Sequence, residues 1–155
     1  MQTDFPSGIY IVATPIGNLG DVSARAAAIL EAADLIAVED SRVTAKLLRH
    51  LGLKKPMRPY HDHSGEADRD ALVEAARAGV VALVSDAGTP LISDPGYKLV
   101  RAAREAGIMV TSAPGPSAAV MALSISGLPT DRFLFAGFLP PKEKARGDML
   151  DEVRA

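Results

Sequence analysis

Short, unbroken runs of apolar residues alternate along the chain with segments whose apolar residues recur at helical spacing. The apolar runs have the length and continuity of strands that are buried on both faces, and they lie at residues 8–13, 35–38, 80–84 and 108–111. The amphipathic segments predict helices at about residues 21–33, 41–51, 67–78, 97–106 and 117–126. Residues 132–138 (RFLFAGF) predict a further strand after the Leu128-Pro129 break, and residues 54–65 are expected to be irregular.

Polar and glycine residues mark the ends of the predicted helices. Asp21 and Ser41 stand where a side-chain oxygen caps the first turn of a helix, and Asp94 is expected to cap the helix that begins near Gly96. Glycines follow most of the helices, where a left-handed residue commonly ends the last turn. The helices are therefore bounded by signals that are independent of the apolar pattern.

Strands that alternate with helices through short connections predict an α/β fold with a mostly parallel sheet flanked by helices. Right-handed crossovers then bring the loops that follow the strands to one edge of the sheet. Ligands bind beyond that edge in open α/β sheets. The loops after Ala13, Val84 and Thr111 are therefore the candidates for a site.

These three loops share glycine, proline and small polar residues. They read TPIGNLGD (residues 14–21), SDAGTPLISDPG (residues 85–96) and APGPSAAV (residues 113–120). Glycine lets the backbone approach a ligand closely, and free amides at a helix start can point toward one. Each loop could equally be a turn that needs its glycines for its own geometry. Asp86, where the third predicted strand ends, could bind a ligand or cap a turn.

Two further clusters carry candidate chemistry. Glu39-Asp40-Ser41-Arg42 follows the second apolar run, where the acids could hold a substrate or lie at the positive end of a helix, the latter being favoured for Asp40. His61-Asp62-His63 lies in the irregular segment; two histidines could bind a metal, but no third ligand is evident. We therefore expect no metal and interpret His61 and His63 as substrate-contacting residues.

Composition narrows the class of protein. The chain has 155 residues, 48% of them hydrophobic, and no cysteine, which excludes disulfides and thiolate chemistry. Its net charge is −2, so the chain lacks the overall basic surplus that is usual in nucleic-acid-binding domains. This net charge does not exclude a local basic patch. No apolar run is long enough to span a membrane and no signal peptide is evident, so we expect a cytoplasmic protein.

Five segments taken together resemble one family in order and spacing. They are YIVATPIGNLGD, AVEDSRVTAKLL, SDAGTPLISDPG, PGPSAAVMALSISGLP and RFLFAGFLPP, which cover the chain from Ile9 to about Pro141. These segments resemble the ribosomal RNA small subunit methyltransferase I family, part of the tetrapyrrole methylase superfamily. The dinucleotide fingerprint GxGxxG is missing, so a nucleotide-dependent oxidoreductase is disfavoured.

The resemblance implies two α/β domains that hold S-adenosyl-L-methionine in the cleft between them, and a homodimer. It implies methyl transfer to the ribose 2′-oxygen of a cytidine in small-subunit (16S) ribosomal RNA. By the same analogy the cofactor contacts are Pro15, Ile16, Asp86, Thr89, Ser117 and Ala118. The substrate contacts are expected at Glu39, Arg42, His61 and His63. No unique general base is identified. Glu39 is preferred among five candidates, which are Glu39, Asp40, Asp86, His61 and His63.

The chain also departs from the family's pattern. Ser64 stands where the family more usually has asparagine, and Ala136 stands where an acidic residue is common. Family members continue through a second domain. We therefore expect residues 1–128 to be the N-terminal methylase domain, and residues 129–155 to be a linker and the start of a truncated C-terminal domain. Such a fragment would be inactive alone. Alternatives are a folded module that only dimerises or binds RNA, or a methylase of the same fold acting on a small molecule or a protein.

Overall fold

Five parallel strands form the centre of the molecule. The computed structural model describes residues 4–61 and 63–154. The strands pair in the order β3-β2-β4-β1-β5, and every neighbouring pair is parallel. Their bounds are β1 (Gly8–Val12), β2 (Leu35–Val38), β3 (Met57–Pro59), β4 (Val80–Val84) and β5 (Val110–Ala113). The predicted α/β fold with a parallel sheet is confirmed.

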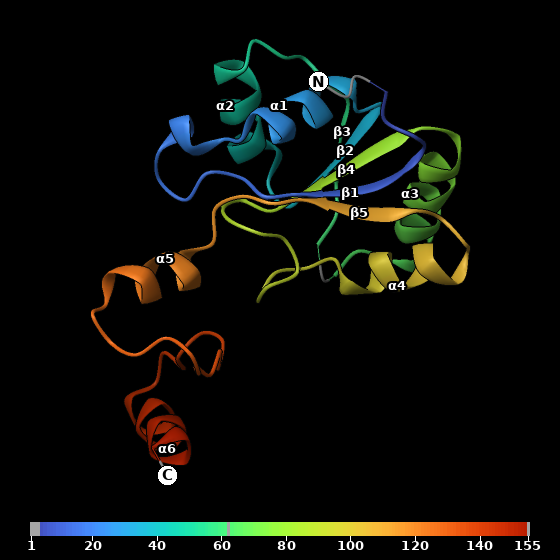
Figure 1. The fold of residues 1–155 in the computed structure, drawn as a ribbon. Helices are drawn as coiled ribbons and strands as arrows, with labels where there is room; N and C mark the ends of the chain where they lie inside the picture. Colours follow the sequence, from blue (N-terminus) through green and yellow to red (C-terminus); the bar gives the residue numbers. More distant parts are fainter. Residues whose placement is uncertain (1–3, 62, 155) are drawn as a thin grey trace.

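Helices cover both faces of this sheet, as Figure 1 shows. On one face lie α1 (Ala24–Ala32) and α2 (Ser41–His50), and on the other lie α3 (Glu66–Ala78) and α4 (Tyr97–Glu105). Successive residues of a strand point to opposite faces. Tyr10 and Val12 of β1 therefore pack with α1 and α2, whereas Ile9 and Ile11 pack with α3 and α4. Burial on both faces explains why these strands read as continuous apolar runs.

Two helix caps differ from the prediction. Asp21 lies in a short 3-10 turn, η1 (Leu19–Asp21), and the Ser23 hydroxyl caps α1 by accepting the Ala26 N–H at 3.1 Å. Helix α2 is capped by Asp40, which accepts the Arg42 N–H at 2.8 Å, while Ser41 is its first residue. In each case the side chain of the residue just before the helix is the one that faces the free amides. The favoured role of Asp40 as a cap is confirmed.

Two other details of the prediction are wrong. Asp94 is not a cap, because α4 begins after Gly96 without a side-chain hydrogen bond. The irregular segment contains β3, which pairs with β2 from Met57 to Pro59. This strand is three residues long and contains arginine and proline, so its sequence carries no alternating or continuous apolar signal. Pairing at the sheet edge, which is a tertiary effect, is what makes it a strand.

Beyond β5 the chain leaves the sheet, and Figure 1 shows its last helices extending away from it. These are α5 (Ala118–Ile125) and α6 (Glu143–Val153), and none of the described residues after Ala113 is buried. The strand predicted at 132–138 is absent from the described structure, because this segment lies beside no strand with which to pair. No helix in the described part of the chain is long and apolar enough to cross a membrane.

Candidate functional site

The three predicted loops are joined by hydrogen bonds at the carboxyl edge of the sheet. Thr14 and Gly88 exchange two backbone hydrogen bonds, of 2.9 and 3.0 Å, which tie the first loop to the second. The buried Thr14 hydroxyl also donates to the Ser85 carbonyl at 3.2 Å. The Thr89 hydroxyl donates to the Pro116 carbonyl at 3.1 Å, which ties the second loop to the third. The loops therefore meet at one edge, as predicted.

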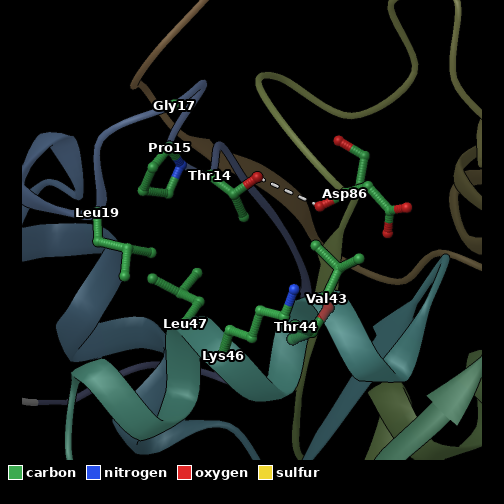
Figure 2. A pocket seen from close by; sticks show the side chains of 10 residues that line it. Thr14, Pro15, Gly17, Leu19, Val43, Thr44, Lys46, Leu47 and Asp86 are labelled. Carbon is green, nitrogen blue, oxygen red and sulfur yellow. Dashed lines mark hydrogen bonds between the residues drawn. The ribbon is translucent and has the colours of Figure 1, made fainter.

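Two cavities lie at this edge. The first, here called the α2 cavity, has a volume of about 180 Å³ and lies between the first loop and α2. Figure 2 shows Leu19 and Leu47 approaching each other across it. It is lined by Thr14, Pro15, Gly17, Leu19, Val43, Thr44, Lys46, Leu47, Ser85 and Asp86.

The second cavity, here called the α5 cavity, has a volume of about 340 Å³. The second and third loops, the start of α5 and the segment after it surround this space. It is lined by Ile16, Ala87, Gly88, Thr89, Ile92, Ser93, Asp94, Ser117, Ala118, Ala119, Phe135, Gly137 and Phe138.

The structure divides the six predicted cofactor residues between these cavities. Four of them line the α5 cavity: Ile16, Thr89, Ser117 and Ala118. Pro15 and Asp86 line the α2 cavity instead. Pro15 and Ile16 are adjacent in the first loop, so the division runs through that loop.

The α5 cavity fits a folded nucleoside cofactor. Its volume of about 340 Å³ lies within the range of about 300–1,000 Å³ usual for small-molecule sites. Apolar walls from Ile16, Ile92 and Phe135 could cover an adenine ring, and the Thr89 hydroxyl stands among them. Helix α5 starts without a side-chain cap, so its first amides remain donors for a ligand. The residues present are therefore compatible with S-adenosyl-L-methionine.

Close backbone contacts set the shape of the α5 cavity. Gly88 has φ of +83°, a conformation that side chains disfavour. A Cβ on Gly115 would lie 2.9 Å from the Cβ of Ala13, closer than such atoms come. The third loop can therefore rest against the end of β1 only with glycine at this position.

Asp86 links the second loop to the start of α2. Its Oδ1 accepts the Asp40 N–H at 3.1 Å, and its own N–H donates to Glu39 Oε2 at 3.4 Å. Part of this carboxylate's hydrogen-bonding capacity is thus used within the protein. Asp86 and Glu39 are held as a pair at the carboxyl ends of β4 and β2, beside the α2 cavity.

Charge around the site is partly neutralised. Arg42 donates to both carboxylate oxygens of Asp40, and these hydrogen bonds lower the pKa of Asp40 from 3.8 to about 2. The same contact raises the pKa of Arg42. In the α5 cavity, burial raises the pKa of Asp94, against a hydrogen bond from Ser85 that lowers it. Arg42 is thus held at the start of α2, although its side chain is 87% exposed.

All four predicted substrate residues lie outside both cavities. Glu39, Arg42, His61 and His63 line neither of them. The His61 and His63 rings are 6.1 Å apart between centroids, and the Ser64 hydroxyl accepts the His61 N–H at 2.9 Å. Asp62 lies outside the described residues. No three histidine, aspartate or glutamate side chains are grouped to hold a metal ion within residues 4–61 and 63–154.

Sequence reasoning missed the contribution of α2 to the site. The α2 cavity is lined by Val43, Thr44, Lys46 and Leu47, whereas the sequence predicted residues 41–51 only as an amphipathic helix. The signal that could have found them is the position of this helix directly after β2, whose carboxyl end lies at the ligand edge.

A family model described as tetrapyrrole (corrin/porphyrin) methylases matches residues 8–155. The chain belongs to this family. Membership implies S-adenosyl-L-methionine as the methyl donor. The fold agrees with a crystal structure of uroporphyrin-III-C-methyltransferase from Thermus thermophilus, at a TM-score of 0.60 and 30% identity, over 79% of this chain and 53% of that one.

Curated relatives carry the name that the resemblance predicted. Over 148 residues the chain is 53% identical to ribosomal RNA small subunit methyltransferase I of Escherichia coli O157:H7, covering 95% of this chain and 52% of the relative. Over 146 residues it is 56% identical to the protein of that name from Pasteurella multocida, covering 94% and 52%. The predicted resemblance is confirmed, and the chain spans about half the length of these relatives.

Proposed function

We propose that this chain is the N-terminal part of a methyltransferase that methylates the ribose 2′-oxygen of a cytidine in small-subunit (16S) ribosomal RNA. The observation that carries the proposal is the identity of 53–56% to proteins named ribosomal RNA small subunit methyltransferase I. The neighbour named for a small-molecule substrate is 30% identical, which favours the RNA substrate over a tetrapyrrole.

The cofactor site in this proposal comprises the α5 cavity and two residues that line the α2 cavity. Ile16, Thr89, Ser117 and Ala118 would hold S-adenosyl-L-methionine there, and Pro15 and Asp86 would contact it from the α2 side. When bound, the cofactor supplies an electrophilic methyl group on its sulfonium. The protein's contribution is to orient the acceptor oxygen in line with that methyl group and to exclude water, since positioning alone can supply much of the rate.

The acceptor side is assigned to the polar residues near α2. A ribose hydroxyl is a weak nucleophile, so a nearby carboxylate would favour loss of its proton. Glu39, held by the Asp86 N–H at the end of β2, is our candidate for this contact. Arg42 would meet a phosphate, and His61 and His63 would contact RNA farther from the reacting atoms.

We further propose a two-domain organisation for the whole protein. Residues 1–128 form the N-terminal methylase domain, and residues 129–155 are a linker and the start of a second domain that would close the α5 cavity. The active form would be a homodimer. Its ribosomal RNA partner would place it in the cytoplasm.

The proposal is tested by methyl transfer. The chain is fused to the C-terminal half of the Escherichia coli relative and incubated with labelled S-adenosyl-L-methionine and small ribosomal subunits. The expected product is one labelled cytidine ribose, as mapped by nuclease digestion and mass spectrometry. The Escherichia coli enzyme is the positive control, and calorimetry of cofactor binding checks that the fusion is folded. A folded, cofactor-binding fusion that labels no RNA would overturn the proposal.

The 155-residue chain alone provides a second comparison. We expect no turnover from it, because one wall of the cofactor site would belong to the second domain. Turnover by this chain alone would contradict the proposed two-domain organisation while supporting the proposed reaction. RNA binding by both proteins without methyl transfer by either would favour a module that only binds.

A further inference from the structure

Positive charge is concentrated in one short stretch of the chain. Residues 41–58 contain six lysines or arginines and no aspartate or glutamate, whereas the rest of the chain has 11 basic against 19 acidic residues. The net charge of −2 therefore conceals a strongly basic segment within an acidic protein. This segment comprises α2, β3 and the loop between them.

Four of the six basic side chains form no ion pair with an acidic side chain of the described residues. Arg42 is paired with Asp40, and Arg58 is paired with Asp68 at 2.9 Å. Among the ion pairs of the described residues, none involves Lys46, Arg49, Lys54 or Lys55. We call these four residues the basic strip.

The basic strip starts at the α2 cavity and runs away from it. Lys46 lines the α2 cavity, and Arg49 follows three residues later, so the two lie one turn apart on the same side of α2. Arg49, Lys54 and Lys55 then line another cavity, of about 380 Å³, together with Leu48, Leu53 and Met57. Arg49 therefore links Lys46 at the α2 cavity to a basic hollow beside β3.

We propose that the basic strip binds the phosphodiester backbone of the RNA that flanks the acceptor nucleotide. This inference rests on the proposed function, because the strip begins at the α2 cavity, beside the Asp86–Glu39 pair to which we assign the acceptor. A row of unneutralised cations suits a chain of phosphates, which attracts them without reading sequence. Leu53 and Met57, which are partly exposed, provide an apolar floor against which an unstacked base can pack.

The strip predicts a defined dependence of binding on salt. Each phosphate neutralised on a single strand contributes roughly −0.7 to the slope of log affinity against log salt concentration. Four contacts therefore predict a slope of about −3. If RNA binding depended instead on charges scattered over the surface, changing two neighbouring residues of the strip would not reduce the salt dependence in this way.

The test measures the affinity of the 155-residue chain for a short fluorescein-labelled single-stranded RNA by fluorescence anisotropy. Lys46→Glu with Arg49→Glu is expected to weaken binding about tenfold or more and to make the salt slope shallower by about 1.4. Lys54→Glu with Lys55→Glu is expected to act similarly. The matched control is Lys98→Glu with Arg104→Glu on α4, which makes the same change in net charge on the other face of the sheet.

Binding that depends on the strip must also be distinguished from misfolding and from general attraction to negative charge. Melting temperatures within a few degrees of the unmodified chain establish that the variants are folded. The proposed role of the strip would be contradicted if the control variant weakened RNA binding equally, or if the unmodified chain bound no RNA. It would also be contradicted if the strip bound polyglutamate or vesicles of anionic lipid as tightly as RNA, because the surface would then recognise any polyanion.

Failure of the strip is distinguishable from failure of the proposed function. If RNA binding depends on the basic strip but the fused protein transfers no methyl group, the role of the strip is supported and the proposed reaction is contradicted. If the Lys46→Glu, Arg49→Glu fusion transfers methyl groups with an unchanged KM for the RNA, the proposed reaction is supported and the role of the strip is contradicted.

Discussion

The sheet with its four covering helices and the segment after it differ in burial, although both are rich in apolar residues. In residues 8–113 every residue of β1 and β4 is buried, and α1 to α4 each bury part of one face. In residues 114–154 no residue is buried, and Ile125 in α5 is 86% exposed.

The comparison separates apolar composition from burial. Helix α5 reads AAVMALSI and is mostly apolar, yet it buries no residue, whereas the more polar α2 buries Thr44, Leu47 and Leu48. Burial requires a second layer at the right distance, and α2 has the sheet while α5 does not. The exposed apolar side chains of this segment include Phe133, Leu134 and Phe138, and a group of such residues is typical of an interaction surface. This agrees with the proposed second domain and homodimer.

The largest expected difference between the two regions is in hydrogen exchange. Amides of Val81 and Leu83 in β4 should exchange only through global unfolding, whereas amides of α6 should open at little cost, because a short helix without packing is marginal in water. We expect opening free energies at least about 4 kcal/mol apart, as measured by NMR-detected exchange. Equal protection of α6 would show that another surface, such as a second copy, covers it.

A pair of leucine substitutions tests the same difference energetically. Leu30→Ala in α1 should lower the free energy of unfolding by about 2–5 kcal/mol, because it leaves a cavity under the sheet. Leu134→Ala, at a side chain that is 70% exposed, should change it by less than about 0.5 kcal/mol. Urea denaturation measures both. If Leu134→Ala lowered the free energy of unfolding as much as Leu30→Ala does, the two regions would not differ in packing.

A smaller effect is expected inside the packed region, where the first loop meets the second. Thr14→Val removes the hydrogen bond from the Thr14 hydroxyl to the Ser85 carbonyl and should lower the free energy of unfolding by about 1 kcal/mol. Thr111→Val in β5 is the matched control, because that hydroxyl makes no hydrogen bond to a described residue. Thermal denaturation of both variants measures the difference, and equal stability would show that this bond contributes nothing to folding.

The smallest effect is electrostatic and confined to the surface of the packed region. The Asp40 carboxyl should titrate at about 2, and Arg42→Ala should raise its pKa toward 3.8, because the hydrogen bonds from Arg42 are lost. A carboxyl with a lowered pKa stabilises the folded state fully above its ordinary pKa, and this contribution is lost as pH falls from about 4 toward 2. NMR titration of the carboxyl carbon measures the shift. Arg101→Ala on α4 should leave the Asp40 titration unchanged.

Much of the packed region was predictable, because its apolar runs and amphipathic segments are typical of buried strands and of helices that pack on a sheet. The runs around Ile11, Ile36 and Val81 read as strands since both faces of each are covered. The predicted strand at 132–138 failed for the opposite reason. Its apolar residues are as suited to a strand as those of β1, but strand formation needs a neighbour with which to pair, and this segment lies away from the sheet.

The amino-acid pattern by itself determined the alternation of strands and helices, the parallel sheet and the edge at which the loops gather, because periodicity and connection length depend only on nearby residues. Only the tertiary structure decided that Pro15 and Asp86 face one cavity while Ile16 and Ser117 face another. Neighbouring residues of an extended loop can point in opposite directions, and which way each one faces is set by the elements that pack around it. The continuity of the basic strip was decided in the same way, by the position of α2 beside β3.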